Sequence, residues 1–392
     1  MTYDAVIVGA SVAGLYAGMK LSERNWRVCI VDRRSRIGLP VRCGQATGNR
    51  AELARFVPID ESWIVSEIKG LTAHVNDTHR WSREIPGTGV ILHRERFEQH
   101  LAEACRRNGV DIRLNTLATG LPGNDGKATG VTLENGTSVD ASFVIGADGA
   151  ESSVGRWAGI TQTLRPDEAF SAAQYSVQSD FCNDGLLHFF IGSGVIPKGY
   201  VWVFPMEEGR LSLGAGLYGC HHSVPKAKHF LDAFLAANLP GVETTDLVTG
   251  CAPLAICPKR LHKANVLVIG DAARQCNPMT VGGIMNALEA TDLAVHRLLE
   301  CGTTARRTAP LSQYSAKWAR RPRKEQKLFL LIQKMALSLT DEEMVRALSL
   351  ASKIFRGKIN RERPFSIPIL RVLRLLVSFF PRLWRFRRIL AL

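Results

Sequence analysis

The sequence predicts an α/β fold in which a Rossmann-type domain with a parallel sheet is joined to an antiparallel-sheet domain and a helical C-terminal region. Three observations support this class. Residues 3–32 alternate strand, glycine turn, helix and strand, residues 168–256 consist of alternating β-type runs, and helical periodicity dominates after residue 300. The 392 residues, 46% hydrophobic and 22% charged, suffice for two lobes with separate cores.

The first strand and turn depend on small residues. The β-branched run 5–8 predicts a buried strand, and residues 9–14 predict a tight turn that opens onto a helix. Gly9 permits the turn, while Gly14 and the small Ala13 let the helix lie close to the strands. The free N–H groups at the helix start face any anion above the turn, and a dinucleotide pyrophosphate suits that position.

The next strand, predicted at 28–31, ends in an acid. Asp32 is placed to accept hydrogen bonds from a ribose. Ser11 replaces the middle glycine of GxGxxG, and its hydroxyl can itself face the phosphate. Because the acid follows 18 residues after Gly14 in a strand, turn, helix, strand order, a dinucleotide site is favoured over an ordinary βαβ unit.

A second GxGxxG match, residues 214–219, lacks this context. No helix opens on Gly219 and no acid follows at the right distance. We therefore predict a glycine-containing strand end there and no second nucleotide site.

The net charge of +14 is concentrated near the C-terminus, where residues 353–388 contribute +10. The rest of the chain is close to neutral, so we expect no nucleic-acid surface on the body. The arginine-rich, aromatic segment 353–392 favours an interfacial helix on an anionic membrane over a basic helix packed on its own domain or on RNA.

Nine scattered cysteines, without CxxC pairs or metal-like Cys/His spacing, predict reduced thiols and no metal site. No apolar stretch reaches the length of a membrane span, and no signal peptide precedes the first strand. We therefore expect a cytoplasmic protein, located at the cytoplasmic membrane face if the basic segment binds lipid.

A glycine- and proline-rich loop at 38–48 follows the second strand. Arg33, directly after Asp32, is a candidate for cofactor binding, and Arg42 can clamp a pyrophosphate or be a solvated surface charge. Cys43 is either a small buried apolar group or a proton donor near a cofactor. Arg94 stands at the start of a helix predicted at 93–110.

Two further strand ends carry an acid and glycines. A strand ending near 146 delivers Asp148 and Gly149 to a loop. The strand 264–271 ends in Gly270 and Asp271 and is followed by a turn and a long helix whose start points back to the strand end, with small or turn-forming residues at Pro278, Gly282 and Gly283.

Together these three elements resemble the FAD-binding pattern of the para-hydroxybenzoate hydroxylase superfamily. The resemblance implies that Asp271 lies near the ribityl chain of FAD and that Arg94 helps to hold the cofactor. No second Rossmann unit is visible, so the electron source is either NADPH, bound transiently, or a ferredoxin-type donor.

Within that superfamily, YVWVFP at 200–205 and PVRCG at 40–44 are similar to motifs of the geranylgeranyl reductase family. Membership implies saturation of isolated C=C bonds in a prenyl chain of a lipid or diphosphate by reduced FAD, with Tyr200, Trp202 and Phe204 lining the substrate site. Cys43 is the candidate for the acid that protonates the alkene, or for a relay to that acid. The alternative, a flavin monooxygenase or halogenase, leaves YVWVFP unexplained, and the region around Trp63 lacks the WxWxIP signature of halogenases.

The expected domains are discontinuous in sequence. The FAD-binding domain comprises 1–65, 90–165 and 260–300, and the antiparallel-sheet substrate domain comprises 66–89 and 166–259. The helical, basic region is 301–392, with amphipathic helices predicted at 311–336 and 341–355.

Overall fold

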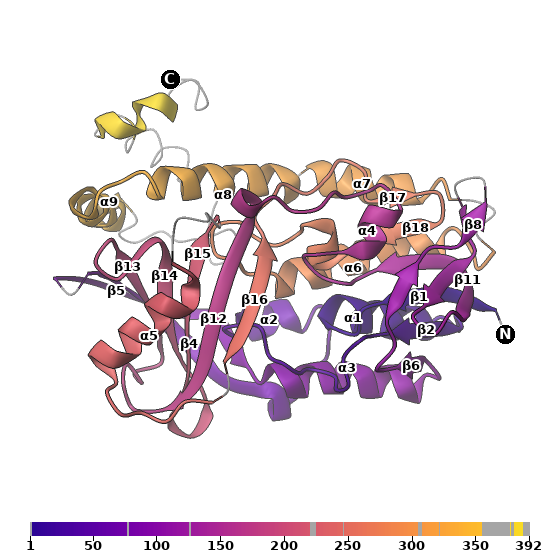
Figure 1. Cartoon of the computed structure of the whole chain (residues 1–392), viewed down its shortest axis with the longest axis horizontal. Helices are drawn as coiled ribbons and strands as arrows, with labels where there is room; N and C mark the ends of the chain where they lie inside the picture. The colour runs from indigo at the N-terminus through magenta and orange to yellow at the C-terminus, as the bar shows by residue number, and fades with distance from the viewer. Residues whose placement is uncertain are drawn as a thin grey trace.

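The computed structural model describes residues 2–76, 78–124, 127–219, 225–245, 247–304, 308–320, 322–354, 377 and 380–386. They form two large sheets, one toward each end of the long axis, with helices packed against both (Figure 1). This arrangement confirms the predicted α/β class.

The first sheet has the order β17-β18-β11-β1-β2-β6, with β10 beside β11 and β7 beside β10. The strands from β18 to β6 run parallel, as a Rossmann-type sheet requires. The strand bounds are β1 Tyr3–Val8, β2 Val28–Val31, β6 Asp111–Arg113, β7 Ala118–Gly120, β10 Gly130–Leu133, β11 Ser138–Gly146, β17 His262–Lys263 and β18 Val266–Val268, and a separate hairpin is formed by β8 Gly123–Asn124 and β9 Lys127–Ala128.

Alternation along β1 divides the core between the two faces of this sheet. Ala5 and Ile7 belong to the core that α1, α3, α6 and α7 cover, whereas Val6 and Val8 belong to a second core beneath β7, β10 and α4. The helices are α1 Val12–Ser22, α2 Arg50–Leu53, α3 Arg94–Arg107, α4 Ser153–Trp157 and α6 Ile284–Leu299.

The second sheet has the order β16-β12-β15-β14-β13-β4-β5-β3. It is mostly antiparallel, as predicted, but β4 and β13 pair in parallel. It also crosses the predicted boundaries, because β3 pairs with β5, β4 starts before residue 66 and β5 continues beyond residue 89. The elements are β3 Ala46–Thr47, β4 Ile64–Val75, β5 His79–Leu92, β12 Ala169–Gln178, β13 Leu186–Gly192, β14 Ile196–Pro205, β15 Arg210–Tyr218, β16 Val248–Pro253 and the covering helix α5 Ala227–Asn238.

The second glycine motif is part of β15 and provides room for aromatic rings. A Cβ on Gly214 would lie 2.1 Å from the indole ring of Trp202, and a Cβ on Gly216 would lie 2.0 Å from the ring of Phe170. The predicted glycine-containing strand is therefore present, and its glycines serve the packing of neighbouring strands.

The C-terminal helices pack on both sheets. Within the stretch predicted as a helix at 311–336, the structure describes α7 Leu311–Arg320 and α8 Pro322–Ala336. Figure 1 shows α7 and α8 along the top of the view, from the first sheet toward the second. Leu311, Tyr314 and Trp318 of α7 are buried in the same core as α1, so this part of 301–392 is continuous with the predicted FAD-binding domain.

The final helix of that series, α9 Asp341–Ile354, joins α8 and a short segment around 380 in a small apolar cluster. Phe380 and Leu383 are buried in that cluster, while Trp384 is exposed. Most of the predicted membrane-binding segment 353–392 lies outside the described residues. Among the helices that the structure does describe, none combines the length and apolarity of a membrane span.

Candidate active site

The turn after β1 is built as the sequence predicts. Gly9 adopts φ +109°, and a Cβ there would lie 2.3 Å from the carbonyl oxygen of Ala147. A Cβ on Gly14 would lie 1.9 Å from the carbonyl oxygen of Gly9, so both positions exclude side chains. A Cβ on Gly270 would lie 3.1 Å from that of Ala13, which explains the small residue at position 13.

Asp32 is buried at the end of β2, but its partner is Arg34. Arg34 donates from its backbone N–H at 2.8 Å and from two guanidinium nitrogens at 3.1 and 2.9 Å, while Ala10 N–H donates at 2.6 Å. Burial acts to raise the pKa of Asp32, but the hydrogen bonds and charge of Arg34 lower it overall. Arg33, the residue singled out in the sequence, is exposed.

Ser11 belongs to a charged network that motif reasoning did not reveal. Its hydroxyl donates to Oε1 of Glu98 at 2.6 Å and accepts from Arg94 at 3.2 Å, so it is occupied within the protein. Arg94 also donates to Glu98 at 2.7 Å. Glu98 is almost fully buried, and its only sequence signal is a charge on the apolar stripe of α3, one turn after Arg94.

Asp148 caps a helix with both carboxylate oxygens. It accepts from the hydroxyl of Ser152 at 2.6 Å and from the N–H groups of Ser153 and Val154 at 2.7 and 3.0 Å. These bonds fix the start of α4, so the side chain predicted to bind cofactor has a capping role in this structure. Gly149 adopts φ +83° with open space around its Cβ position.

The Gly270 and Asp271 turn meets the start of α6. A Cβ on Gly283, the N-cap of α6, would lie 3.3 Å from a carboxylate oxygen of Asp271, and no side chain caps that helix. Burial raises the pKa of Asp271 to about 6, with the charge of Arg94 acting in the opposite direction. The structure thus brings together Arg94 and Asp271, which are far apart in sequence.

Buried glutamines of α8 hold the loop between Asp271 and Gly282. Gln333 donates to the carbonyl of Pro278 at 2.8 Å, and Gln326 donates to the carbonyls of Arg274 and Cys276 at 2.7 and 3.1 Å. The loop is therefore positioned by a helix that sequence reasoning assigned to a separate region.

The loop of Cys43 lies against β14. A Cβ on Gly44 would lie 2.9 Å from the ring of Phe204 and 3.3 Å from the indole nitrogen of Trp202. The half-buried Cys43 accepts from the N–H of Gln45 at 3.2 Å, and its thiol is near enough to Arg94 and Tyr200 for electrostatic interaction with both. The structure therefore brings the two predicted subfamily motifs together.

Tyr200, Trp202 and Phe204 lie in one apolar cluster with Phe189. Trp202 and Phe204 are buried, and the indole N–H donates to Ser212 at 3.3 Å, whereas Tyr200 is half-buried and its pKa is raised by burial. Tyr218, which no motif indicated, bonds from its hydroxyl to the carbonyl of Met279 and connects β15 to the loop before α6. Arg42 is exposed, and its side chain lies beside Gly250 of the edge strand β16.

The residues at the first turn fit a bound FAD. The first N–H groups of α1 have no acceptor within the helix, and Ser11 makes no capping bond, so these donors suit a pyrophosphate. Oε2 of Glu98 is buried without a hydrogen bond among the described residues and lies 3.8 Å from Arg34. Such an acceptor suits the hydroxyl groups of a dinucleotide.

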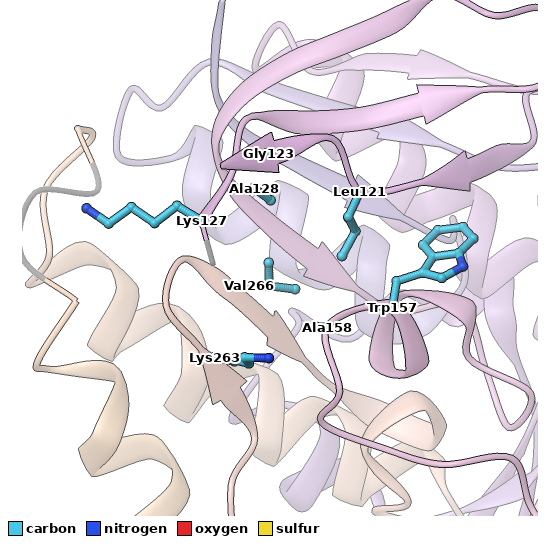
Figure 2. A pocket seen from close by; sticks show the side chains of 8 residues that line it. All are labelled: Leu121, Gly123, Lys127, Ala128, Trp157, Ala158, Lys263 and Val266. Atoms are coloured by element: carbon cyan, nitrogen blue, oxygen red, sulfur yellow. The ribbon is translucent and has the colours of Figure 1, made fainter. Parts of the chain in front are cut away.

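A separate open pocket lies between the β8–β9 hairpin and α4 (Figure 2). Its lining includes Lys127, Trp157 and Lys263 and contains none of the predicted site residues. The candidate active site therefore remains the region of the Gly9 turn, Asp271 and β14.

Comparisons with known proteins identify two domains by sequence. The FAD binding domain matches residues 2–210, and the geranylgeranyl reductase catalytic domain matches residues 168–253. A digeranylgeranylglycerophospholipid reductase of Methanosarcina acetivorans is 32% identical over 93% of this chain and 91% of its own length. A geranylgeranyl bacteriochlorophyll reductase-like protein of Thermoplasma acidophilum has a TM-score of 0.85 and 26% identity, covering 99% of both chains.

A flavin-dependent brominase is also similar, with a TM-score of 0.71 and 15% identity over 96% of this chain and 93% of its own, and it shares the fold alone.

The site and the domain matches define the chain as an FAD-dependent oxidoreductase. Its extended similarity to the reductases and the match over β12 to β16 show that it belongs to the geranylgeranyl reductase family. The predicted resemblance, enzyme class and FAD cofactor are thereby confirmed.

Proposed function

We propose that this protein saturates isolated C=C bonds in the prenyl chain of a geranylgeranyl-type lipid or diphosphate. The observation that carries the proposal is the contact of Gly44, in the Cys43 loop, with Trp202 and Phe204 of β14. This contact places the thiol of Cys43 near an apolar, aromatic surface and near the residues that would hold FAD. The names of the similar reductases support the same chemistry.

Reduced FAD, when bound, would supply the hydride. An isolated alkene lacks a conjugated carbonyl to accept negative charge, so the protein must provide a proton at nearly the same time. Sγ of Cys43 lies near Tyr200 of the aromatic cluster and is our candidate proton donor or relay. Tyr200, Trp202 and Phe204 would keep the chain flat and water away.

The nucleotide end of the cofactor would be held by the Gly9 turn, the start of α1, Arg94 and Glu98. Asp271 and the start of α6, which lie beside each other, would meet the ribityl chain. Electrons would come from NADPH or a ferredoxin-type donor. Anaerobic mixing of the holoenzyme with each donor, followed at the flavin absorbance, would identify which one reduces it.

The experiment that tests the function is mass spectrometry of lipids after reaction of the holoenzyme with geranylgeranyl lipids and a chemical reductant. We expect masses to rise in steps of two hydrogens. Unchanged prenyl masses with a fully reducible flavin would contradict the proposal. Substrate-stimulated oxygen uptake with NADPH would instead support the monooxygenase alternative.

We also propose peripheral membrane contact through 353–392, supported by the basic composition of this segment and the exposed Trp384. The full chain should float with anionic vesicles at low salt and lose this binding at high salt, whereas zwitterionic vesicles should bind it weakly. Equal binding to both vesicle types would contradict an electrostatic contact.

A further inference from the structure

Two histidines and a cysteine meet on the second sheet, away from the proposed substrate surface. His74 lies on β4, His188 on β13 and Cys182 in the turn before β13, and one ligand atom from each lies within 4.8 Å of the others. His74 stacks on Phe190 at 4.1 Å, and Phe190 belongs to the core under α5. The adjacent Phe189 belongs to the aromatic cluster of β14, so strand alternation places the two sites on opposite faces.

The geometry of this cluster is close to that of a metal site. Nε2 of His74 and Nδ1 of His188 are 3.0 Å apart. Zinc bond lengths of 2.0–2.1 Å to nitrogen and 2.3 Å to sulfur place tetrahedral ligand atoms about 3.3 to 3.6 Å from one another. A metal ion would replace the hydrogen bond between the two nitrogens, which would separate by a few tenths of an ångström and turn toward the ion. The thiol, which lies within 4.8 Å of both nitrogens, would move toward them.

Asp184 orients the buried histidine. Nε2 of His188 lies 2.9 Å from Oδ1 of Asp184, and the side chain of His188 is 2% exposed. Since an ionised carboxylate only accepts, Nε2 donates to Asp184, and Nδ1 is the ring nitrogen that faces His74. A carboxylate that binds the second nitrogen of a histidine is the usual support for a metal-ligating imidazole.

Cys182 has an uncommon backbone conformation for a residue with a side chain. Its φ is +56°, within a turn closed by the N–H of Asn183 donating to the carbonyl of Asp180 at 3.2 Å. Such conformations cost energy and are enriched at ligand sites. Arg80 of β5 lies 3.6 Å from Asp184 and places a positive charge beside this turn.

We propose that His74, Cys182 and His188 bind one zinc ion, with water in the remaining position and Asp184 orienting His188. The ion would join β4, β13 and the turn between Asp180 and Asp184. Sequence spacing could not indicate this site, because the parallel pairing of β4 with β13 brings His74 to residues far later in the chain.

The test uses the full-length protein. Metal-stripped protein is titrated with Zn²⁺ against a chromophoric chelator, and with Co²⁺ while the thiolate-to-cobalt charge-transfer absorption is followed. We expect one Zn²⁺ per chain and a charge-transfer band that Cys182→Ser abolishes. Asp184→Asn should weaken Zn²⁺ binding by about 10- to 100-fold.

Cys251→Ser is the matched control, because Cys251 is an exposed thiol on β16 of the same sheet, and this variant should retain both signals. Circular dichroism confirms folding of each variant. Wild-type protein that binds Zn²⁺ no more tightly than Asp184→Asn, or gives no thiolate band with Co²⁺, would overturn the proposal, and neither result depends on Cys182→Ser being stable.

Discussion

Arg34 occupies both carboxylate oxygens of Asp32. Its Nε lies 3.1 Å from Oδ1 and a terminal nitrogen lies 2.9 Å from Oδ2, while backbone N–H groups of Ala10 and Arg34 donate to the same oxygens. An ionised carboxylate has about four acceptor positions, and all are used. A ribose hydroxyl would therefore have to compete with Arg34 for Asp32.

Arg34→Met should destabilise the flavin-free protein by about 1 to 3 kcal/mol at neutral pH, because it leaves the buried Asp32 without its cation. Arg34 is what lowers the pKa of Asp32 in the folded state against the effect of burial. The stability that the Arg34–Asp32 pair contributes is therefore fully present above the pKa of Asp32 in the unfolded chain, about 3.9. It is lost as the pH falls through the lower pKa of Asp32 in the folded protein. Urea unfolding at pH 7 and pH 3 measures both effects.

Arg33→Met is the matched control, since the neighbouring Arg33 is exposed. We expect it to change stability by less than about 0.5 kcal/mol. Equal losses from the two substitutions would show that the pairing with Asp32 does not stabilise the fold.

The sequence revealed those parts of the site that local geometry dictates. Gly9 and Gly14 could be predicted, because a strand-to-helix turn that brings backbone within contact distance leaves no room for a Cβ. The sequence could not predict that Arg34, rather than Arg33, pairs with Asp32. That pairing depends on which side chain the turn after β2 directs back to Asp32. Glu98 was missed because a charge on the apolar stripe of α3 does not by itself reveal the hydrogen bonds that Glu98 makes with Ser11 and Arg94.

Long-range packing accounts for the other differences. Asp148 matched a cofactor motif, yet its hydrogen bonds go to the start of α4. The buried glutamines of α8 looked like polar residues of an amphipathic helix, and their loop partners lie far earlier in the chain. Periodicity predicts which face of a helix is polar, but it does not identify what that face binds.

Asp271→Asn should stabilise the flavin-free protein at neutral pH by up to about 3 kcal/mol. Burial raises the folded pKa to about 6 from the usual value near 4, so the folded state favours the protonated acid. Stability therefore falls as pH rises from about 4 to 6, and the advantage of the uncharged asparagine should appear over that window. Thermal melts of wild type and variant across this range measure the difference.

Glu289→Gln on α6 controls for general effects of carboxylate removal, because Glu289 is exposed. It should change stability by less than about 0.5 kcal/mol throughout. A constant difference between Asp271→Asn and wild type from pH 4 to pH 7 would contradict a burial-raised pKa.

Gln333→Leu should destabilise the protein by about 1 to 3 kcal/mol, because the carbonyl of Pro278 loses its donor in a buried position. It should also weaken FAD binding, since the loop that Gln333 holds lies between Asp271 and Gly282. Urea unfolding and flavin titration measure the two effects. Lys327→Ala, an exposed position on α8, should leave both unchanged, and unaltered FAD affinity in Gln333→Leu would separate this contact from the cofactor site.

Gly214→Ala should destabilise the protein by about 1 to 3 kcal/mol through overpacking. The new Cβ would lie 2.1 Å from the indole ring of Trp202, which is itself held by Ser212. Thermal melts measure the loss. Gly120→Ala is a strand control whose Cβ would have no neighbour closer than 3.9 Å, and it should be nearly neutral. Similar losses at both positions would show that the clash with the Trp202 ring does not determine the effect.

Cys43→Ser should reduce prenyl reduction by about 10²- to 10⁴-fold while FAD remains bound and reducible, if Sγ supplies or relays the proton. A hydroxyl can accept the hydrogen bond that Gln45 N–H makes to the thiol at 3.2 Å, so the loop should keep its place beside Trp202 and Phe204. Single-turnover mass spectrometry of the lipid product, with flavin absorbance as the measure of cofactor occupancy, separates chemistry from binding. Cys251→Ser controls for the loss of an exposed thiol. Full turnover by Cys43→Ser would show that another group supplies the proton. The half-buried Tyr200 would then be the next residue to replace.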